Sequence, residues 1–346
     1  MVRNRTIDTA KWRCAGYRRN RCTERVLYAL IACVTLTACT APPKIPSMIS
    51  GDWTPPTLSK VTAVSENTVS LAFDEPVRAV EIAIDPPVGT TESSWDGGSL
   101  QLTGEVQFDA ATEYWIDACV EDEAGNRSSV LVSVYGLNER PPAVQINEFV
   151  CEGSRSHPDW VELKVLADGN LAGMCLYEGS PGNWDSRFVF PALEVSAGAY
   201  VVVHFKPEGI PEEVDELDDP SASGGHDVHP DAWDFWVGEG DGIPNTTGAL
   251  TLSRFPDGPI VDAVLYSTKR YKADDEKRGF GTKAQLAIFE ELASVGAWKT
   301  ADDLVIPDDA IDPDDSTATR SVCRTPGAPD TDHRTDWHIT PTSGAT

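Results

Sequence analysis

Residues 159–165 read DWVELKV, and their alternation of apolar and polar side chains is typical of a β-strand. The odd-numbered residues from 161 to 165 are apolar, whereas Glu162 and Lys164 are charged, which predicts a strand with one face in water. Farther along, residues 200–203 (YVVV) predict a strand that is buried on both faces. Only one stretch of the chain has good helical periodicity. The sequence therefore predicts an all-β protein.

The residues before this stretch, 53–135, predict a β-sandwich of their own. Apolar residues alternate with polar ones in four runs: Val69, Leu71 and Phe73; Val80, Ile82 and Ile84; Tyr114, Ile116, Ala118 and Val120; and Val130, Val132 and Val134. Turn residues such as Asp96-Gly97-Gly98 separate the runs. The pattern predicts an immunoglobulin-like (Ig-like) sandwich. Residues 73–77 (FDEPV) and 120–126 (VEDEAGN) resemble bacterial Ig-like domains of cell-surface proteins, which implies a spacer or adhesion module without catalytic residues.

A second domain is expected after the linker at 136–142 (GLNERPP). It begins with VQINEF at 144–149, continues through DWVELKV and ends with TPGAP at 325–329. In this order the motifs resemble the lamin tail domain, an Ig-like β-sandwich that also occurs in many exported bacterial proteins. The resemblance covers most of residues 143–329. It implies a structural role for Glu148 and Glu162, which we expect to bond backbone groups at a sheet edge rather than to act as an acid–base pair.

Two insertions depart from the lamin tail pattern, and loops of this kind carry specificity on a rigid scaffold. Residues 206–236 form an acidic loop that contains Gly and His, and residues 269–315 include a predicted helix. Thr282 and Gln285 have capping-box spacing, and Gly296 can end the helix. An apolar stripe of this helix is expected to pack on the sandwich, with partner binding as the alternative; it is formed by Leu286, Phe289, Leu292 and Ala293.

The start of the chain is basic and then apolar. The run Val26–Leu36 leads into Leu36-Thr37-Ala38-Cys39, which resembles a bacterial lipoprotein signal with its lipobox. The resemblance implies that the mature protein begins at Cys39, which would carry a thioether-linked diacylglycerol. An ordinary secretory signal that ends in a cysteine by chance is the alternative. The apolar run is too short for a stable transmembrane helix, which needs about 20 residues.

The charge of the chain limits its partners. The full sequence has 28 basic and 55 acidic residues, and the part after Cys39 keeps 20 basic and 53 acidic ones, a net charge of −33. This charge repels nucleic-acid phosphates, so nucleic acid is not expected as a partner. The expected partners are a membrane, through the lipid anchor, and an unidentified protein or cell-surface ligand.

Four of the eight cysteines lie after Cys39, and an even number in an exported protein favours disulfides. They are Cys119, Cys151, Cys175 and Cys323. Three pairings are possible, and we expect at least one bond within the second domain, with Cys151–Cys175 as the preferred pair. Cys119 shares a strand face with Asp117 and Glu121, so it is expected outside the core.

Two acidic segments offer possible metal ligands. His226, His229 and Asp231, with Asp227 or His204 in reach, could bind zinc, but Gly224-Gly225 and Pro230 predict an irregular loop that orients no imidazole. A second segment could offer oxygens to calcium, but it lacks the Gly turn and terminal Glu of an EF-hand and predicts a solvated loop; its residues are Asp308, Asp309, Asp312, Asp314 and Asp315. No metal or cofactor is therefore expected.

A single basic cluster is interpreted as a solvated surface paired with residues 274–276; it comprises Lys269, Arg270, Lys272, Lys277 and Arg278. The GxSxG, HExxH and GxxxxGK[ST] motifs are absent.

Two hypotheses for function follow. The first is a non-catalytic, lipid-anchored binding or assembly module on the periplasmic or outer face of a bacterial membrane. The alternative is a metal-dependent hydrolase that uses the 206–236 loop. The expected architecture is two Ig-like β-sandwiches in tandem with a short helix inserted in the second: signal peptide 1–39, tether 40–52, Ig-like domain 53–135, linker 136–142, lamin-tail-like domain 143–329 and disordered tail 330–346.

Overall fold

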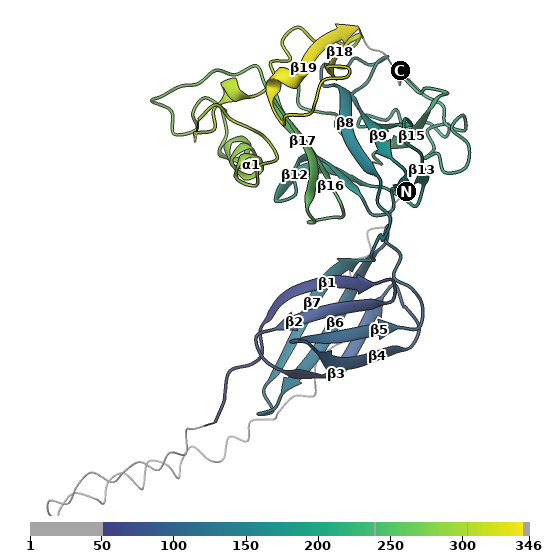
Figure 1. The fold of residues 1–346 in the computed structure, drawn as a ribbon, viewed down its shortest axis with the longest axis vertical. Helices are drawn as coiled ribbons and strands as arrows, with labels where there is room; N and C mark the ends of the chain where they lie inside the picture. Colours follow the sequence, from purple (N-terminus) through teal and green to yellow (C-terminus); the bar gives the residue numbers. More distant parts are fainter. Residues whose placement is uncertain (1–50, 239, 303, 342–346) are drawn as a thin grey trace, which may run out of the picture. The chain divides into compact units, whose positions relative to one another are not determined.

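The computed structural model describes residues 51–238, 240–302 and 304–341, and its fold is all-β (Figure 1). The buried apolar side chains form two main clusters. One lies between Val69 and Val134, and the other lies between Val144 and Trp337. Each cluster is enclosed by its own pair of β-sheets.

The first sandwich has seven strands in two sheets. Figure 1 shows β1, β2, β5 and β4 side by side in one layer, with β3, β6 and β7 in the other. The strands are β1 (Leu58–Ser65), β2 (Thr68–Phe73), β3 (Val77–Asp85), β4 (Thr91–Asp96), β5 (Ser99–Gly104), β6 (Glu113–Asp122) and β7 (Arg127–Tyr135). Gly97 and Gly98 both have positive φ in the tight turn between β4 and β5, a conformation that glycine adopts without steric cost.

The predicted alternation agrees with burial in most of this sandwich, including Val69, Leu71 and the inward residues of β6. The prediction is wrong at Val80, which is 39% exposed. The register of β3 against β6 shifts between Ala79 and Glu81, so Val80 is an extra, bulged residue and the alternation changes phase there.

The second sandwich packs a six-stranded sheet, in the order β15-β14-β9-β8-β18-β19, against a four-stranded sheet, in the order β12-β11-β16-β17. β10 (Gly169–Asn170) and β13 (Glu194–Val195) form a small separate pair. The other strands are β8 (Ala143–Val150), β9 (Trp160–Ala167), β11 (Cys175–Ser180), β12 (Asn183–Val189), β14 (Tyr200–His204), β15 (Ala232–Trp236), β16 (Thr247–Ser253), β17 (Ile260–Ser267), β18 (Arg320–Arg324) and β19 (Trp337–Pro341).

The C-terminal segment is ordered where the structure describes it, so the prediction of a disordered tail is wrong for residues 330–341. β19 pairs with β18 in antiparallel register, from Arg320 opposite Pro341 to Arg324 opposite Trp337. Trp337 is buried in the core, and a short 3-10 helix precedes it at Arg334–Asp336. The polar and charged composition of the segment led to the prediction of disorder. Burial of the Trp337 side chain stabilises the folded segment.

The predicted helix is present as α1 (Lys283–Ser294). Thr282 is its N-cap, with Oγ1 accepting a hydrogen bond from the Gln285 backbone N–H at 3.1 Å. Ile288, Phe289 and Leu292 are buried in the core of the second sandwich, which confirms the expected docking of the apolar stripe. Within the described residues, no helix has the length and apolarity that a transmembrane span requires.

A polar contact, which we call the sheet link, joins the two sheets of this sandwich. Asp262 on β17 accepts a hydrogen bond from the Ile146 backbone N–H on β8 at 2.7 Å. Arg324 on β18 donates to the Ile146 carbonyl at 3.0 Å and to Asp262 Oδ2 at 3.1 Å. Both charged side chains are 5% exposed, and the Arg324 guanidinium stacks on Trp337 with 4.6 Å to the ring centroid. The link therefore joins the two sheets by hydrogen bonds between groups that are almost completely shielded from solvent.

Candidate functional site

The 206–236 insertion folds along the edge of the six-stranded sheet. Its last residues form β15, which runs parallel to β14 at the sheet edge. Carboxylates of the loop satisfy backbone donors of this strand. Glu216 accepts from the Asp234 N–H at 2.8 Å, and Asp215 accepts from the Trp236 N–H at 2.9 Å. Burial raises the pKa of both carboxyls. The insertion thus covers an exposed strand edge with its own acidic side chains.

The two histidines of this loop contact different groups: a carboxylate for His226 and a backbone N–H for His229. His226 Nε2 lies 3.3 Å from Glu208 Oε1, whereas His229 Nδ1 accepts the Asp231 backbone N–H at 3.2 Å. Within the described residues, two groups of three side chains could share a metal ion, and neither contains His226, His229 or Asp231. The loop therefore does not bring the three candidate zinc ligands together.

Two other histidine–carboxylate contacts were not predicted from the sequence. His204 is fully buried, donates through Nε2 to Asp234 Oδ1 at 2.7 Å and stacks on Trp236 with 4.0 Å between ring centroids. His157 Nδ1 lies 2.8 Å from Asp227 Oδ1, which joins the segment before β9 to the insertion. The His204–Asp234 contact could have been predicted, because each of these polar residues lies in a strand that is otherwise apolar or aromatic.

Glu148 and Glu162 were expected to bond backbone groups at a sheet edge. They lie in the middle of the six-stranded sheet instead, so this part of the prediction is wrong. Glu148 on β8 is directly opposite Glu162 on β9, and both are 0% exposed. Glu148 Oε1 accepts from the Ser321 hydroxyl, and Glu162 Oε1 accepts from Asn147 Nδ2 at 2.7 Å. The face expected to be wet is dry here, because it carries its own apolar cluster of Val150, Trp160, Val202 and Ala232.

Cys119, Cys151, Cys175 and Cys323 are free thiols in the described structure, so the predicted Cys151–Cys175 disulfide is wrong. Cys151 and Cys175 are both buried, but they lie on different sheets: Cys151 directly follows β8, and Cys175 is on β11. Burial raises the pKa of Cys151, Cys175 and Cys323 to about 12, which keeps these thiols protonated and unreactive. Cys119 is only partly buried, as expected.

Several carboxylates of the acidic run at 302–315 make hydrogen bonds and ion pairs within the fold, so the prediction of a solvated loop is wrong for them. Asp309 is buried and accepts backbone N–H groups from Ala301 and Ile306, both at 3.1 Å. Asp308 accepts the Tyr271 N–H at 2.7 Å, and Asp312 pairs with Arg270 at 2.5 Å. In the described part of the chain, the ion pairs of the basic cluster join Arg270 to Asp312 and Arg278 to Glu290, and they do not involve residues 274–276 as predicted.

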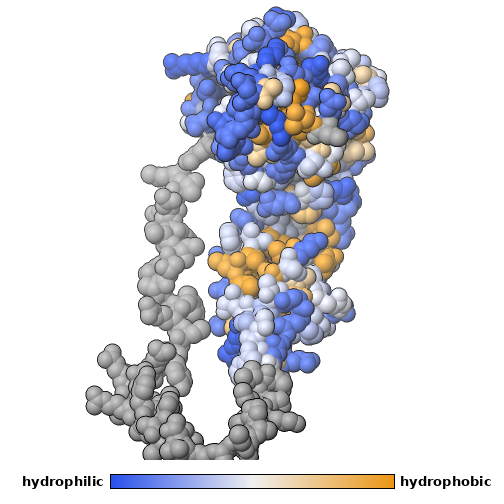
Figure 2. Space-filling view, turned by 90° about the vertical axis from the view of Figure 1, so that its left-hand side faces the viewer, coloured by the Kyte–Doolittle hydropathy of each residue, from blue (hydrophilic) through white to orange (hydrophobic). Residues whose placement is uncertain are grey.

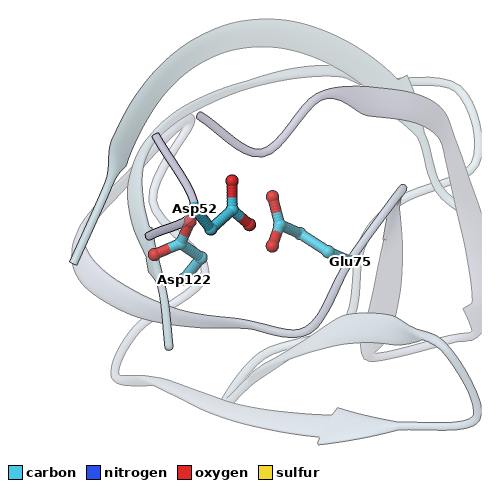
Figure 3. A group of neighbouring side chains, drawn as sticks. All are labelled: Asp52, Glu75 and Asp122. Carbon is cyan, nitrogen blue, oxygen red and sulfur yellow. The ribbon is translucent and has the colours of Figure 1, made fainter. Parts of the chain in front are cut away.

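Three carboxylates converge at one end of the first sandwich: Asp52, Glu75 and Asp122 (Figure 3). Each offers an oxygen, and these oxygens lie within 4.8 Å of one another. Asp122 is buried; burial raises its pKa, but hydrogen bonds from the side chain and backbone of Asn126 outweigh this effect and lower it. Burial and the neighbouring acids raise the pKa of Glu75. Oxygen ligands of this kind suit a hard cation such as calcium.

The other group of three, Asp262, Asp330 and Asp332, already has a cation beside it. Arg324 contacts Asp262 Oδ2 at 3.1 Å and Asp330 Oδ1 at 2.6 Å. The guanidinium therefore offsets part of the charge of this group, which adjoins the sheet link.

Comparison with known proteins agrees with a distinct second domain. A family model named TP_1001_2nd and described as "protein second domain" matches residues 142–339. This chain belongs to that family. A protein of Treponema pallidum (strain Nichols) named "Uncharacterized protein" is 30% identical over 154 residues, which are 44% of this chain and 38% of that protein. The chain thus covers well under half the length of this relative.

A crystal structure of a DUF4876 family protein from Bacteroides thetaiotaomicron VPI-5482 aligns with 65% of this chain and 79% of its own length. The sequence identity is 12% and the TM-score is 0.25, a likeness that carries no argument about function.

The region that matches the TP_1001_2nd family contains a buried acid with no ion pair among the described residues, Glu178 on β11, whose contact is with the backbone of Asp185. It is 4% exposed and lies directly opposite Leu250, a core residue, and Ser186, whose hydroxyl has no hydrogen-bond partner among the described residues. Burial, with a smaller effect from the charge of Asp185, raises the pKa of Glu178 to about 7. Sequence analysis missed this residue because it occupies a core position of a short strand next to a bulge.

The histidine contacts give a prediction for zinc in this family member. We expect substoichiometric zinc by elemental analysis of protein purified without a His tag, because His226 and His229 bind different partners. The double variant H226A/H229A should have the same zinc content. Stoichiometric zinc in the wild type that the double variant loses would contradict this prediction and favour the metal-dependent hydrolase.

Proposed function

We propose that this protein is a non-catalytic cell-envelope lipoprotein, a membrane-anchored binding or assembly module built from two β-sandwiches. The lipobox-like sequence Leu36-Thr37-Ala38-Cys39, directly after the apolar run Val26–Leu36, is the observation that carries the proposal. Cys39 lies outside the described residues. A diacylglyceryl group with a further acyl chain on this residue would give stable attachment, because two lipid signals suffice where one is marginal.

The described part of the chain supports a binding role over catalysis. Several side chains that could do acid–base or metal chemistry make structural contacts instead: Glu148 and Glu162 within a sheet, His204 with Asp234, and the loop carboxylates along β15. The residue types that sequence analysis associated with a site thus stabilise the scaffold. The resemblance to exported Ig-like and lamin tail domains agrees with this role.

Metabolic labelling tests the anchor. Cells that express the full chain and receive labelled palmitate should yield labelled protein that partitions into detergent, and Cys39→Ser should remove the label completely. Cys33→Ser is the matched control, because it changes a leader cysteine outside the lipobox and should keep the label. Continued labelling of the Cys39→Ser variant would refute the proposal.

A further inference from the structure

The outer face of the three-stranded sheet β3-β6-β7 presents a large aromatic residue to solvent. We call it the Trp115 face, and its central residues are Ala83, Asp85, Trp115, Asp117, Leu131 and Ser133. Trp115 is 46% exposed and Leu131 is 64% exposed, while their neighbours Tyr114 and Ile116 point into the core. Figure 2 shows one side of the molecule, on which hydrophobic residues form separate patches within a hydrophilic surface. Leu131 lies diagonally across from Trp115 on this face, so the indole and the Leu side chain form adjoining apolar contacts that a partner could use.

The register places carboxylates around the indole. Asp85 is directly opposite Trp115 on the neighbouring strand, where side chains are about 5 Å apart at Cβ. Asp117 follows Trp115 on the same face and lies directly opposite Leu131. The ring therefore has an acidic side chain beside it along the strand and another across the sheet.

The cations of this face are engaged elsewhere. Arg78 and Arg127 both bind Glu121, at 2.5 Å and 2.7 Å, at the far end of the strands. In the described part of the chain, no ion pair involves Asp85, Asp117 or the nearby Glu81. The region around Trp115 thus carries uncompensated negative charge.

These observations indicate which kind of side chain a partner would place on this face. An indole face attracts a Lys ammonium or Arg guanidinium through its quadrupole, and adjacent carboxylates add a charge-assisted contact. A second copy of this chain is disfavoured, because it would bring an equally acidic face against this one. Resting on the proposed binding role, we infer that the Trp115 face docks a basic protein segment, with a Lys or Arg side chain on Trp115 and an apolar side chain on Leu131.

Peptide binding to the full chain in detergent micelles tests this inference. The probe is a fluorescent octapeptide of alternating Lys and Leu, measured by anisotropy at two salt concentrations. Trp115→Ser and the double variant D85N/D117N should each weaken binding about tenfold. Two matched controls should bind as the wild type does: Trp53→Ser, which removes a Trp that is 73% exposed, and E92Q/D96N, which removes two exposed acids of β4.

The outcomes separate the alternatives. Equal affinity of wild type and Trp115→Ser, or equal losses in the controls, would show diffuse attraction to an acidic protein and overturn the inference. Trp115-dependent binding of a neutral hexasaccharide of N-acetylglucosamine, without Trp115-dependent peptide binding, would assign the face to glycans and also overturn it. Palmitate labelling is independent of these results, so a labelled protein that fails to bind peptide refutes only the inference, and an unlabelled protein that binds refutes only the lipid anchor.

Discussion

Replacing Arg324 with methionine is expected to lower the free energy of unfolding of the second sandwich by about 3–5 kcal/mol, because it leaves the Asp262 carboxylate buried without its cation. The change also removes the stacking contact with Trp337 and the bond to the Ile146 carbonyl. Urea denaturation followed by Trp fluorescence measures the effect. Arg320→Met, an exposed position on the same strand, is the matched control and should change little.

The pH dependence of this variant gives a further check. Burial raises the pKa of Asp262 to about 7, and the Arg324 charge acts in the opposite direction. Without Arg324 the ionised form loses its main stabilising contact, so the loss of stability should be larger at pH 8.5 than at pH 5. Adding Asp262→Asn to Arg324→Met should recover part of the loss at high pH. If the double variant is less stable than Arg324→Met by the full cost of Asp262→Asn alone, the two side chains are not coupled.

Replacing Glu178 with glutamine is expected to stabilise the second sandwich at pH 8 by about 2 kcal/mol and to have little effect at pH 4. The pKa of this carboxyl is about 7 in the folded protein, compared with an ordinary value of 4.5. A raised pKa means that the folded state binds the proton more tightly than the unfolded chain does. The associated stability is therefore present below the ordinary pKa and is lost as the pH rises through 7.

Urea midpoints measured from pH 4 to pH 8.5 test this prediction, since the difference between Glu178→Gln and the wild type isolates this carboxyl from other titrating groups. Glu212→Gln is the control, because it makes the same chemical change at an exposed position of the same sandwich. A constant difference between Glu178→Gln and the wild type at all pH values would show that the carboxyl is already ionised, or already neutral, throughout.

Local sequence patterns predicted the individual strands and the helix better than they predicted how the strands pair with one another. The alternation in β2, β6 and β9 and the cap of α1 depend on residues close in sequence, and these features could be read from the chain. The bulge at Val80 could not be predicted, because an inserted residue changes the phase of an alternation without changing its composition. Likewise, the parallel strand β15 lies in a segment whose acidic residues indicate a loop.

The candidate site residues were harder to interpret than the fold. The sequence identified Glu148 and Glu162 as structural, but their burial depends on strand order, which places β8 and β9 at the centre of the sheet. Similarly, the partners of His204 and Arg324 lie on strands far away in sequence. The cysteine count favoured a disulfide, whereas the packing places the cysteines as separate small apolar residues.

The position of β19 affects how the protein can fold as it is synthesised. Glu148 and Ser321, which are bonded across β8 and β18, are 173 positions apart, and β19 comes later still. A chain that emerges from its N-terminus can complete the first sandwich early, but the six-stranded sheet keeps an open strand until residue 341 is available. During that interval Arg324 lacks Trp337 and the edge of β18 is free to pair with other chains. The six-stranded sheet of the second domain is therefore completed only when the last described strand has been synthesised.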